Sequence, residues 1–399
     1  MPPPTCTGPA RVGYAEIAVH AGEHTGTRPG HAGVALHTPQ GICGYLDPYV
    51  PEATWRRFQH ASWTSPEIEP GFVFTELVPS WHAGTPEASW IEVGARVRRH
   101  GTGGWSNWLI LARWADHDTT VHPASVPATR ARSSEAVRVD TDTLHATEVA
   151  DAWQLRVTLL RPEDGPGRGP TVSYLAAMVS GPAMAGRPGR ASETGAAAGQ
   201  VLDVPALSQR IHRDRHPEWG GGDVWCSPTC VAMVLGYWST GPDSSALFWI
   251  DPSYPDRPVY HAVRHTWDYA YRGAGNWSFN VAYAATFGLR SFVTRLRDLT
   301  EAEAFIVAGI PLVVSLYVDP NELAGAEYAS PGHLVVLAGF TGDGDVVVHD
   351  PGARDPTTIR RVYRRGQFEH AWQAGSGGIV YVIHIPTVDP PKRSAEPNW

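Results

Sequence analysis

The stretch GGGDVWCSPTCVAMVLGYW (Gly220–Trp238) decides how the second half of this 399-residue chain is interpreted. It places Cys226 and Cys230 one helical turn apart, directly after a run of glycines. The apolar residues that follow recur at helical spacing, so we expect a buried helix that begins near Cys226. Pro228 suits the first turn of such a helix, because backbone N–H groups there have no intrahelical partner. The stretch therefore predicts a cysteine at the N-terminus of a buried helix.

This position favours a reactive thiol at Cys226. A helix N-terminus and a nearby histidine both stabilise the thiolate form. Cys230 lies one turn further in, beyond the reach of the helix end, and suits a small core residue. A disulfide between positions i and i+4 of one helix would fit bridge geometry poorly. Because a lone cysteine before an apolar helix is more often a core residue than a nucleophile, the interpretation depends on its possible partners.

A candidate base and its orienting group lie in SPGHLVVLAGFTGDGDVVVHDPGARDP (Ser330–Pro356). His333 begins an apolar strand and Asp350 ends the next one, and the turn TGDGD separates the two strands. An antiparallel hairpin would bring these two side chains together at one end. His349 is the alternative histidine, but side chains alternate along a strand, so it would face away from Asp350. The pattern favours His333 as the base.

Candidates for the oxyanion donor and for substrate contacts are also present. Gln209, in VPALSQ, lies 17 residues before Cys226. Its side-chain amide, together with the backbone N–H of Cys226, would suit a tetrahedral oxyanion. Trp225 directly precedes the cysteine, and Trp277 and Asn280 lie in GNWSFN before a predicted helix. These three residues are candidates for substrate binding, although structural packing explains them equally well.

Together, VPALSQ, GGGDVWCSPTCVAMVLGYW and GHLVVLAGFTGDGDVVVHDP resemble the C39-like family of papain-like cysteine peptidases, especially its stand-alone actinomycete branch. The resemblance covers Val201 to Ile385. It implies a papain-like fold in which Cys226 is the nucleophile and His333 is the base. It also implies that Asp350 orients His333 and that Gln209 contributes to the oxyanion hole.

The chain departs from the better-known C39 peptidases in three ways. Those enzymes are fused to ABC transporters and cleave leader peptides after a double glycine. This chain has no apolar run of about 18 residues, and its only lysine, Lys392, lies in PPKRS and not in a Walker A motif. Ser227 follows the cysteine where those enzymes usually have glycine, and Gln209 lies further upstream. The transporter-linked substrate is therefore not implied.

The N-terminal part of the chain is rich in strand patterns. WIEVGARVR (Trp90–Arg98) alternates between apolar and polar residues, as does AWQLRVTLL (Ala152–Leu160). WSNWLILARW (Trp105–Trp114) and TVSYLAAMV (Thr171–Val179) predict further strands. Turn-rich segments separate these strands, which is typical of a β-sandwich.

The C-terminal part begins with helical patterns and ends with strands, which indicates an α+β domain. LTEAEAFIVAG suggests a helix capped by Thr300, with Glu303 completing a capping box. The expected fold class is thus α+β, with a papain-like cysteine peptidase domain preceded by an all-β sandwich-like domain.

We expect four segments along the chain. Residues 1–180 form the sandwich-like domain, a possible binding module, and residues 181–200, which are small and polar, form a flexible linker. Residues 201–386 form the C39-type peptidase domain. Residues 387–399 form a disordered tail.

Composition excludes some partners. The net charge is −8 and no basic tract is present, so we expect no nucleic acid partner. No membrane span is expected. The first residues lack a charged segment followed by an apolar one, so the chain as given has no signal peptide. Its localisation is therefore uncertain: the family resemblance implies secretion, and the alternative is the cytoplasm.

Tryptophans in the N-terminal half offer two interpretations. They could stack on sugar rings, which makes a cell-wall glycan a candidate partner, but packing inside a sandwich is the simpler explanation. The tryptophans concerned are Trp81, Trp90, Trp105, Trp108 and Trp114.

A histidine pair and a cysteine pair are candidates for a metal site and for a disulfide, respectively. His261 and His265 have the spacing of zinc ligands on a helix, but no glutamate completes an HExxH motif. Cys6 and Cys43 could form a disulfide or remain as free thiols. We expect no metal and no cofactor.

The most specific hypothesis is a cysteine peptidase or amidohydrolase. Such an enzyme would cleave a peptide or amide bond of a peptide or protein through a thiol acyl-enzyme. Two alternatives stay open. The same triad could transfer the acyl group to an amine, as transglutaminases do, or the peptidase fold could be inactive and the sandwich could bind glycan.

Overall fold

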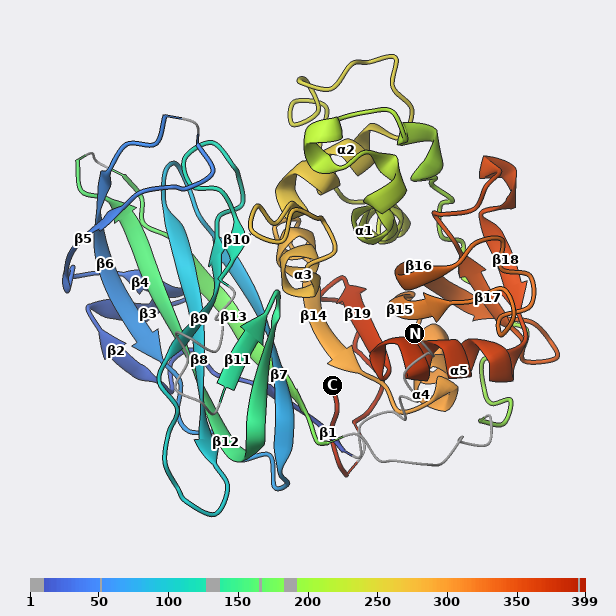
Figure 1. Ribbon diagram of the computed structural model, residues 1–399, viewed down its shortest axis with the longest axis horizontal. Coiled ribbons are helices and arrows are strands. Elements are labelled where there is room, and N and C mark those ends of the chain that lie inside the picture. The colour runs from blue at the N-terminus through green and yellow to red at the C-terminus, as the bar shows by residue number, and fades with distance from the viewer. Residues whose placement is uncertain (1–10, 51, 127–136, 165–166, 183–191, 394) are drawn as a thin grey trace. The chain divides into compact units, whose positions relative to one another are not determined.

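The computed structural model describes residues 11–50, 52–126, 137–164, 167–182, 192–393 and 395–399. These residues form two compact units, each with its own sheet (Figure 1). The described residues of the first unit fall within Gly13–Pro182 and Trp267–Thr286. Those of the second unit fall within Ala183–Thr266 and Phe287–Trp399, and the described residues up to Val12 also belong to it. The predicted fold class, α+β with an all-strand N-terminal part, is confirmed.

The first unit is built on a 13-stranded antiparallel sheet. Its strands are β1 (Val12–Glu16), β2 (Glu23–Thr25), β3 (Thr27–Gly30), β4 (Gly33–Leu36), β5 (Gly41–Tyr45), β6 (Arg56–Thr64), β7 (Phe74–Gly84), β8 (Trp90–Arg99), β9 (Leu109–Trp114), β10 (Ala124–Ser125), β11 (Val137–Asp140), β12 (Thr143–Pro162) and β13 (Thr171–Ser180). The 20-residue β12 pairs with β6, β7, β8 and β11, so it is the central strand of the unit.

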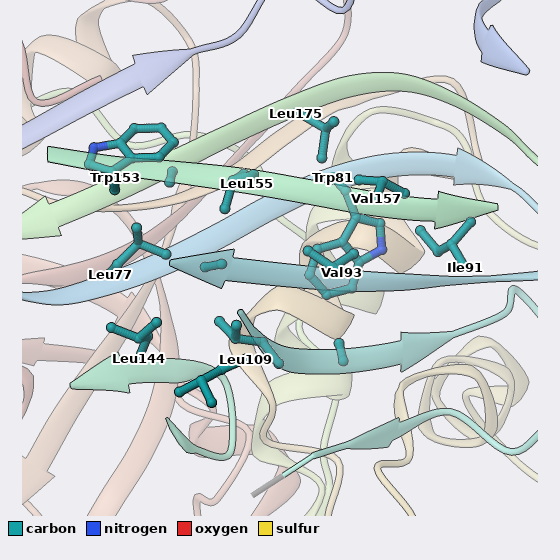
Figure 2. Packing of buried hydrophobic residues seen from close by; sticks show 14 of the residues in the cluster. Leu77, Trp81, Ile91, Val93, Leu109, Leu144, Trp153, Leu155, Val157 and Leu175 are labelled. Carbon is teal, nitrogen blue, oxygen red and sulfur yellow. The ribbon is translucent and has the colours of Figure 1, made fainter. Parts of the chain in front are cut away.

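The alternation in the sequence accounts for the core of this unit. Trp153, Leu155 and Val157 of β12 are buried, whereas the residues between them are partly exposed. Side chains on a strand point to opposite faces with a period of two, so these three share one face. Figure 2 shows them beside Leu77 of β7 and Val93 of β8, which belong to the same buried cluster.

Helix α3 (Trp277–Ala285) also belongs to the first unit, although it comes late in the sequence. Its N-cap is Asn276, whose side chain accepts a hydrogen bond from the Phe279 N–H. The Phe279 ring packs edge-on against Trp81 of β7 at 6.1 Å between centroids, and the Ser278 hydroxyl donates to the Pro79 carbonyl at 2.7 Å. The chain therefore leaves the second unit after Thr266 to complete the core of the first.

The second unit contains the remaining helices and strands. Its helices are η1 (Arg210–His212), η2 (Pro217–Trp219), η3 (Gly222–Val224), α1 (Cys226–Tyr237), α2 (Arg257–Thr266), α4 (Leu299–Val307), η4 (Pro356–Thr358) and α5 (Arg365–Ser376). Its strands are β14 (Arg290–Arg295), β15 (Leu312–Val318), β16 (Ser330–Phe340), β17 (Val346–His349), β18 (Arg360–Tyr363) and β19 (Ile379–His384).

These strands form a six-stranded antiparallel sheet in the order β14-β19-β15-β16-β17-β18. The apolar helix α1 packs against α2 and against β15 and β16, and α4 and α5 also contact these two strands (Figure 1). The pairing of β16 with β17 is the hairpin that the sequence predicts. No described helix is long and apolar enough to cross a membrane.

The predicted linker (residues 181–200) and the predicted disordered tail (residues 387–399) both form specific hydrogen bonds where the structure describes them. Residues 183–191 of the predicted linker lie outside the described residues, but the Glu303 carboxylate accepts hydrogen bonds from the backbone N–H groups of Gly195 and Ala197. In the tail, the Asn398 side chain is buried and donates to the Arg295 carbonyl at 2.8 Å. Hydrogen bonds that are not apparent from composition hold both segments.

The predicted cap of α4 was wrong. Asp298, and not Thr300, is the N-cap, and its carboxylate accepts a hydrogen bond from the Glu301 N–H. Glu303 does not turn back to a capping box, because its carboxylate forms a buried ion pair with Arg365 at 2.7 Å.

Candidate active site

The glycine-rich loop before α1 has a conformation that requires glycine. Gly220 and Gly221 have φ angles of 75° and 70°, which are unfavourable for residues with a Cβ. At Gly222 a Cβ would collide with the backbone carbonyl oxygen of Gln209. The loop therefore brings Gln209 close to the start of the helix.

Cys226 is the first residue of α1, as the sequence predicts, and it is partly exposed. Trp225, the N-cap residue, is fully buried. Its indole N–H donates to the Trp219 carbonyl at 2.7 Å, and its ring packs edge-on against Tyr260. Trp225 thus fixes the loop that precedes the cysteine, and its indole is enclosed by protein.

The structure brings His333 and Asp350 together at one end of the β16–β17 hairpin. Nε2 of His333 lies 2.7 Å from Oδ1 of Asp350. The Cys226 thiol lies close enough to the same imidazole for each group to shift the pKa of the other. The three side chains therefore form a continuous chain from thiol to imidazole to carboxylate.

The charges along this chain reinforce one another. Burial would raise the pKa of the Cys226 thiol, but the hydrogen bond and positive charge of His333, with backbone hydrogen bonds from Leu334 and Ser227, lower it overall. Burial would lower the pKa of His333, but the charge and hydrogen bond of Asp350 and the contact with Cys226 raise it to about 10. Both shifts favour a thiolate–imidazolium ion pair over the neutral thiol and imidazole.

Asp350 is held ionised. Burial opposes ionisation, yet the charge of His333 and the hydrogen bonds from His333, Tyr328 and Gly352 lower the pKa of this carboxyl group. The backbone N–H of Gly352 donates to Oδ1 at 2.8 Å. Such a carboxylate can hold the imidazole in one orientation and stabilise its protonated form.

Tyr328 is a site residue that sequence reasoning missed. Its hydroxyl donates to Oδ1 of Asp350 at 2.7 Å and lies 2.7 Å from Nε2 of His333. Burial raises the pKa of Tyr328 well above its ordinary value, and the charge of Asp350 raises it further, so the hydroxyl keeps its proton. The residue lies in the loop before β16, and no periodic pattern or motif in the sequence indicates it.

His349 lies elsewhere, as strand alternation predicts. It pairs with Val336 across the hairpin, and its Nδ1 is 3.4 Å from the Pro205 carbonyl oxygen. Burial lowers the pKa of His349, so this imidazole is neutral near neutral pH. The structure does not bring His349 to the side of Asp350 that His333 occupies.

Gln209 connects the loops that carry Cys226 and Asp350. Its amide Nε2 donates to the Asp223 carbonyl at 2.8 Å, and its backbone N–H donates to the Pro351 carbonyl at 3.0 Å. The side chain is buried, and only one of its two amide N–H groups is needed for the bond to Asp223. The amide oxygen Oε1 is buried and has no hydrogen-bond partner among the described residues.

Trp277 and Asn280 lie on α3 in the first unit, so the structure does not place them relative to Cys226. Asn280 is fully buried, and its side-chain amide donates to the carbonyls of Ala274 and Asn276 at 2.8 Å each. These bonds stabilise the turn that leads into the helix.

The second cysteine of the opening stretch is a core residue in this structure. Cys230 is fully buried, and its thiol donates to the Leu334 carbonyl at 3.3 Å. Burial raises the pKa of Cys230 well above its ordinary value. Cys43 is a free thiol, and Cys6 lies outside the described residues.

The histidine pair is stacked. His261 and His265 have ring centroids 3.9 Å apart, and His265 Nδ1 lies 2.8 Å from the His261 carbonyl oxygen. Across the described part of the chain, no group of three or more His, Cys, Asp and Glu side chains could hold a metal ion.

The tryptophans of the N-terminal half fall into two groups. Trp81, Trp90 and Trp114 are buried in the first unit. Trp105 and Trp108 are partly exposed, and the Arg96 guanidinium lies 4.6 Å and 4.7 Å from their ring centroids.

Comparison with known families agrees with this geometry. Residues 14–180 match the model of the Peptidase C39 N-terminal domain, and residues 201–379 match the model of the Peptidase_C39 like family. No curated protein matches the chain. The second match contains Cys226, His333 and Asp350. It indicates a cysteine peptidase-type fold for the C-terminal half of the chain. The C-terminal half of the chain is therefore similar to the Peptidase_C39-like family, and the half before it is similar to the Peptidase C39 N-terminal domain.

Proposed function

We propose that this protein is a cysteine peptidase or amidohydrolase that cleaves a peptide or amide bond through a thiol acyl-enzyme. The observation that carries the proposal is the chain of contacts from the Cys226 thiol through the His333 imidazole to the Asp350 carboxylate. His333 lowers the pKa of Cys226, and Asp350 raises the pKa of His333. Both shifts favour the thiolate nucleophile and the protonated imidazole that the reaction needs.

In the acylation step, the Cys226 thiolate attacks the carbonyl carbon of the substrate. A C–S bond forms, and the carbonyl oxygen becomes an oxyanion. When this intermediate collapses, the C–N bond breaks and the imidazolium of His333 gives its proton to the leaving amine. The products of this step are a free amine and a thioester on Cys226, with His333 neutral.

In the deacylation step, neutral His333 removes a proton from water while the water oxygen attacks the thioester carbonyl. The C–S bond then breaks and releases a carboxylic acid. The thiolate of Cys226 and the imidazolium of His333 are restored. Asp350 stays ionised throughout and stabilises the imidazolium in each half of the cycle.

Two donors can stabilise the oxyanion. The backbone N–H of Cys226, at the first position of α1, has no intrahelical acceptor. The other candidate donor is the second amide N–H of Gln209, which the bond to the Asp223 carbonyl does not use. Gly222 has no Cβ, so the backbone of Gln209 can pack closely against the loop before α1. Preorganised donors of this kind are worth about 10²–10³ in kcat.

The test is turnover of a peptide mixture by the full-length protein, with products read by mass spectrometry. Wild-type protein should release peptide acids and amines, and Cys226→Ala should release none. Cys230→Ser is the matched control, because it changes a thiol of the same helix outside the contact chain. Loss of turnover in Cys230→Ser with retention in Cys226→Ala would overturn the proposal. Adding a primary amine distinguishes hydrolysis from acyl transfer, since transfer yields an amide product.

A further inference from the structure

A cationic cavity lies beside the contact chain. It has a volume of about 540 Å³ and is lined by Arg210, Arg213, Tyr328 and Arg354. Tyr328 is the residue whose hydroxyl contacts both His333 and Asp350. One wall of the cavity is therefore in direct contact with the proposed base.

Bonds to the loops of the site hold the arginines in place. Nε of Arg210 donates to the Gly352 carbonyl at 3.1 Å, and its guanidinium carbon lies 5.3 Å from the centroid of the Tyr328 ring. Nη1 of Arg210 and Nε of Arg213 both contact the Asp223 carboxylate, at 3.2 Å and 3.0 Å. Arg210 thus connects the cavity to the loop that follows Asp350.

The charges of the cavity do not cancel. Asp223 supplies one negative charge to two guanidinium groups. Arg354 is exposed, and within the described part of the chain its guanidinium forms no ion pair. The nearby Glu327 carboxylate forms its ion pair with the Arg361 side chain at 2.7 Å, and it accepts a hydrogen bond from the backbone N–H of Arg354, not from the guanidinium, at 3.1 Å. A guanidinium stays charged at every accessible pH and matches the geometry of a carboxylate.

The chemistry of the site indicates which part of a substrate reaches this cavity. In the proposed function, on which this inference rests, His333 protonates the leaving amine. The leaving side of the scissile bond must therefore lie on the histidine side of Cys226. Tyr328 contacts His333 there and also lines the cavity.

We propose that this cavity binds a carboxylate on the leaving-group side of the substrate. The carboxylate can belong to an acidic side chain or to the C-terminus of a short leaving peptide. Both sources present the same planar anion to Arg213 and Arg354. A substrate with a neutral leaving side would place no anion among these guanidinium groups.

Binding to the full-length Cys226→Ala protein tests the inference without any need for turnover. The probes are fluorescein-labelled alanine hexapeptides in which Glu or Gln replaces each position in turn, each with a free or an amidated C-terminus. Fluorescence anisotropy gives the Kd of each probe. The second variants, added to Cys226→Ala, are Arg354→Gln, Arg354→Lys and Arg213→Gln. Arg360→Gln is the control, because Arg360 is an exposed residue of β18 outside the cavity lining.

At least one acidic probe should bind about tenfold more tightly than its neutral partner, because hydrogen bonds to a charged group are stronger than those between neutral groups. Arg354→Gln and Arg213→Gln should reduce this preference, Arg354→Lys should retain part of it, and Arg360→Gln should leave it unchanged. Preference for Glu probes identifies a side-chain carboxylate, and preference for free-acid probes identifies a C-terminal one.

Equal affinity for acidic and neutral probes, or a preference that survives both arginine-to-glutamine changes, would overturn the inference. Turnover by the wild-type protein would be untouched by that result. Conversely, a protein that binds acidic probes through these arginines but cleaves nothing would refute the proposed function alone.

Discussion

Oδ1 of Asp350 lies 2.7 Å from Nε2 of His333, and the two residues are only 2% and 4% exposed. A buried ion pair of this kind is sensitive to the loss of either partner, because the charge that remains loses its nearest counter-charge. Asp350 keeps a second cation at a longer distance, since Arg361 Nε lies 3.6 Å from its Oδ2. His349 is adjacent to Asp350 in sequence but contacts the Pro205 carbonyl instead. The contrast between the two histidines leads to the first prediction.

His333→Ala should lower kcat by about 10²–10⁴-fold, the usual contribution of general acid–base catalysis. His349→Ala should retain nearly normal kcat, since its imidazole lies outside the contact chain. Asp350→Asn should give an intermediate rate, because an amide can still orient the imidazole but stabilises the imidazolium less. Steady-state kinetics on variants whose folding is verified by circular dichroism measures all three. An inactive, folded His349→Ala beside an active His333→Ala would reverse the assignment.

Tyr328→Phe should lower kcat by about three- to tenfold, which corresponds to the loss of about one buried hydrogen bond. The hydroxyl positions Asp350 and contacts His333, but takes no part in bond making. The pH profile of kcat/KM separates this role from simple packing, because loss of the donor to Asp350 should move the profile. A slower variant with an unmoved profile would show that Tyr328 only fills space.

The dependence of activity on pH follows from the two pKa shifts. The pKa of Cys226 is lowered from its ordinary value near 9, and that of His333 is raised to about 10. The reactive ion pair exists between these values, so kcat/KM should rise at a pH below 9 and fall as the pH passes through about 10. In Asp350→Asn the alkaline limb should move to lower pH, because the main group that raises the His333 pKa is gone. An alkaline limb that stays in place would show that Asp350 does not set the charge of His333.

Phe279→Ala should lower the free energy of unfolding by about 3–5 kcal/mol, the usual cost of truncating a buried phenylalanine. Phe279 of α3 is fully buried in the core of the first unit, beside Trp81. Trp55→Ala is the control, since that side chain is 71% exposed in the same unit. Urea unfolding followed by fluorescence and circular dichroism gives both values. Equal, small losses in the two variants would show that α3 contributes little to this core.

Elements with strong periodicity could be predicted from the sequence. The two-residue alternation within β12 and the apolar run of α1, which is buried from Ser227 to Leu235, correspond to burial in the structure. The same alternation separates His333 from His349. These predictions depend only on local geometry, which the order of residues determines directly.

Other features depend on contacts between residues distant in sequence. Helix α5 is absent from the sequence predictions, although its buried residues Phe368, Ala371 and Trp372 recur at helical spacing. The sequence also does not indicate that α3 joins the core of the N-terminal unit. Tyr328 and the cationic cavity arise where separate loops converge. No pattern within one segment can predict such convergence.

The central claim is that His333 activates Cys226, and the alkylation rate of each cysteine tests it most directly. With limiting iodoacetamide at about pH 6, peptide mass spectrometry should show Cys226 modified well before Cys43 and Cys230, because its thiolate is the most populated. In His333→Ala, the pH of half-maximal Cys226 reactivity should move up toward the ordinary thiol value near 9. Equal labelling of Cys226 and Cys230, or a Cys226 profile that is the same with and without His333, would contradict the account.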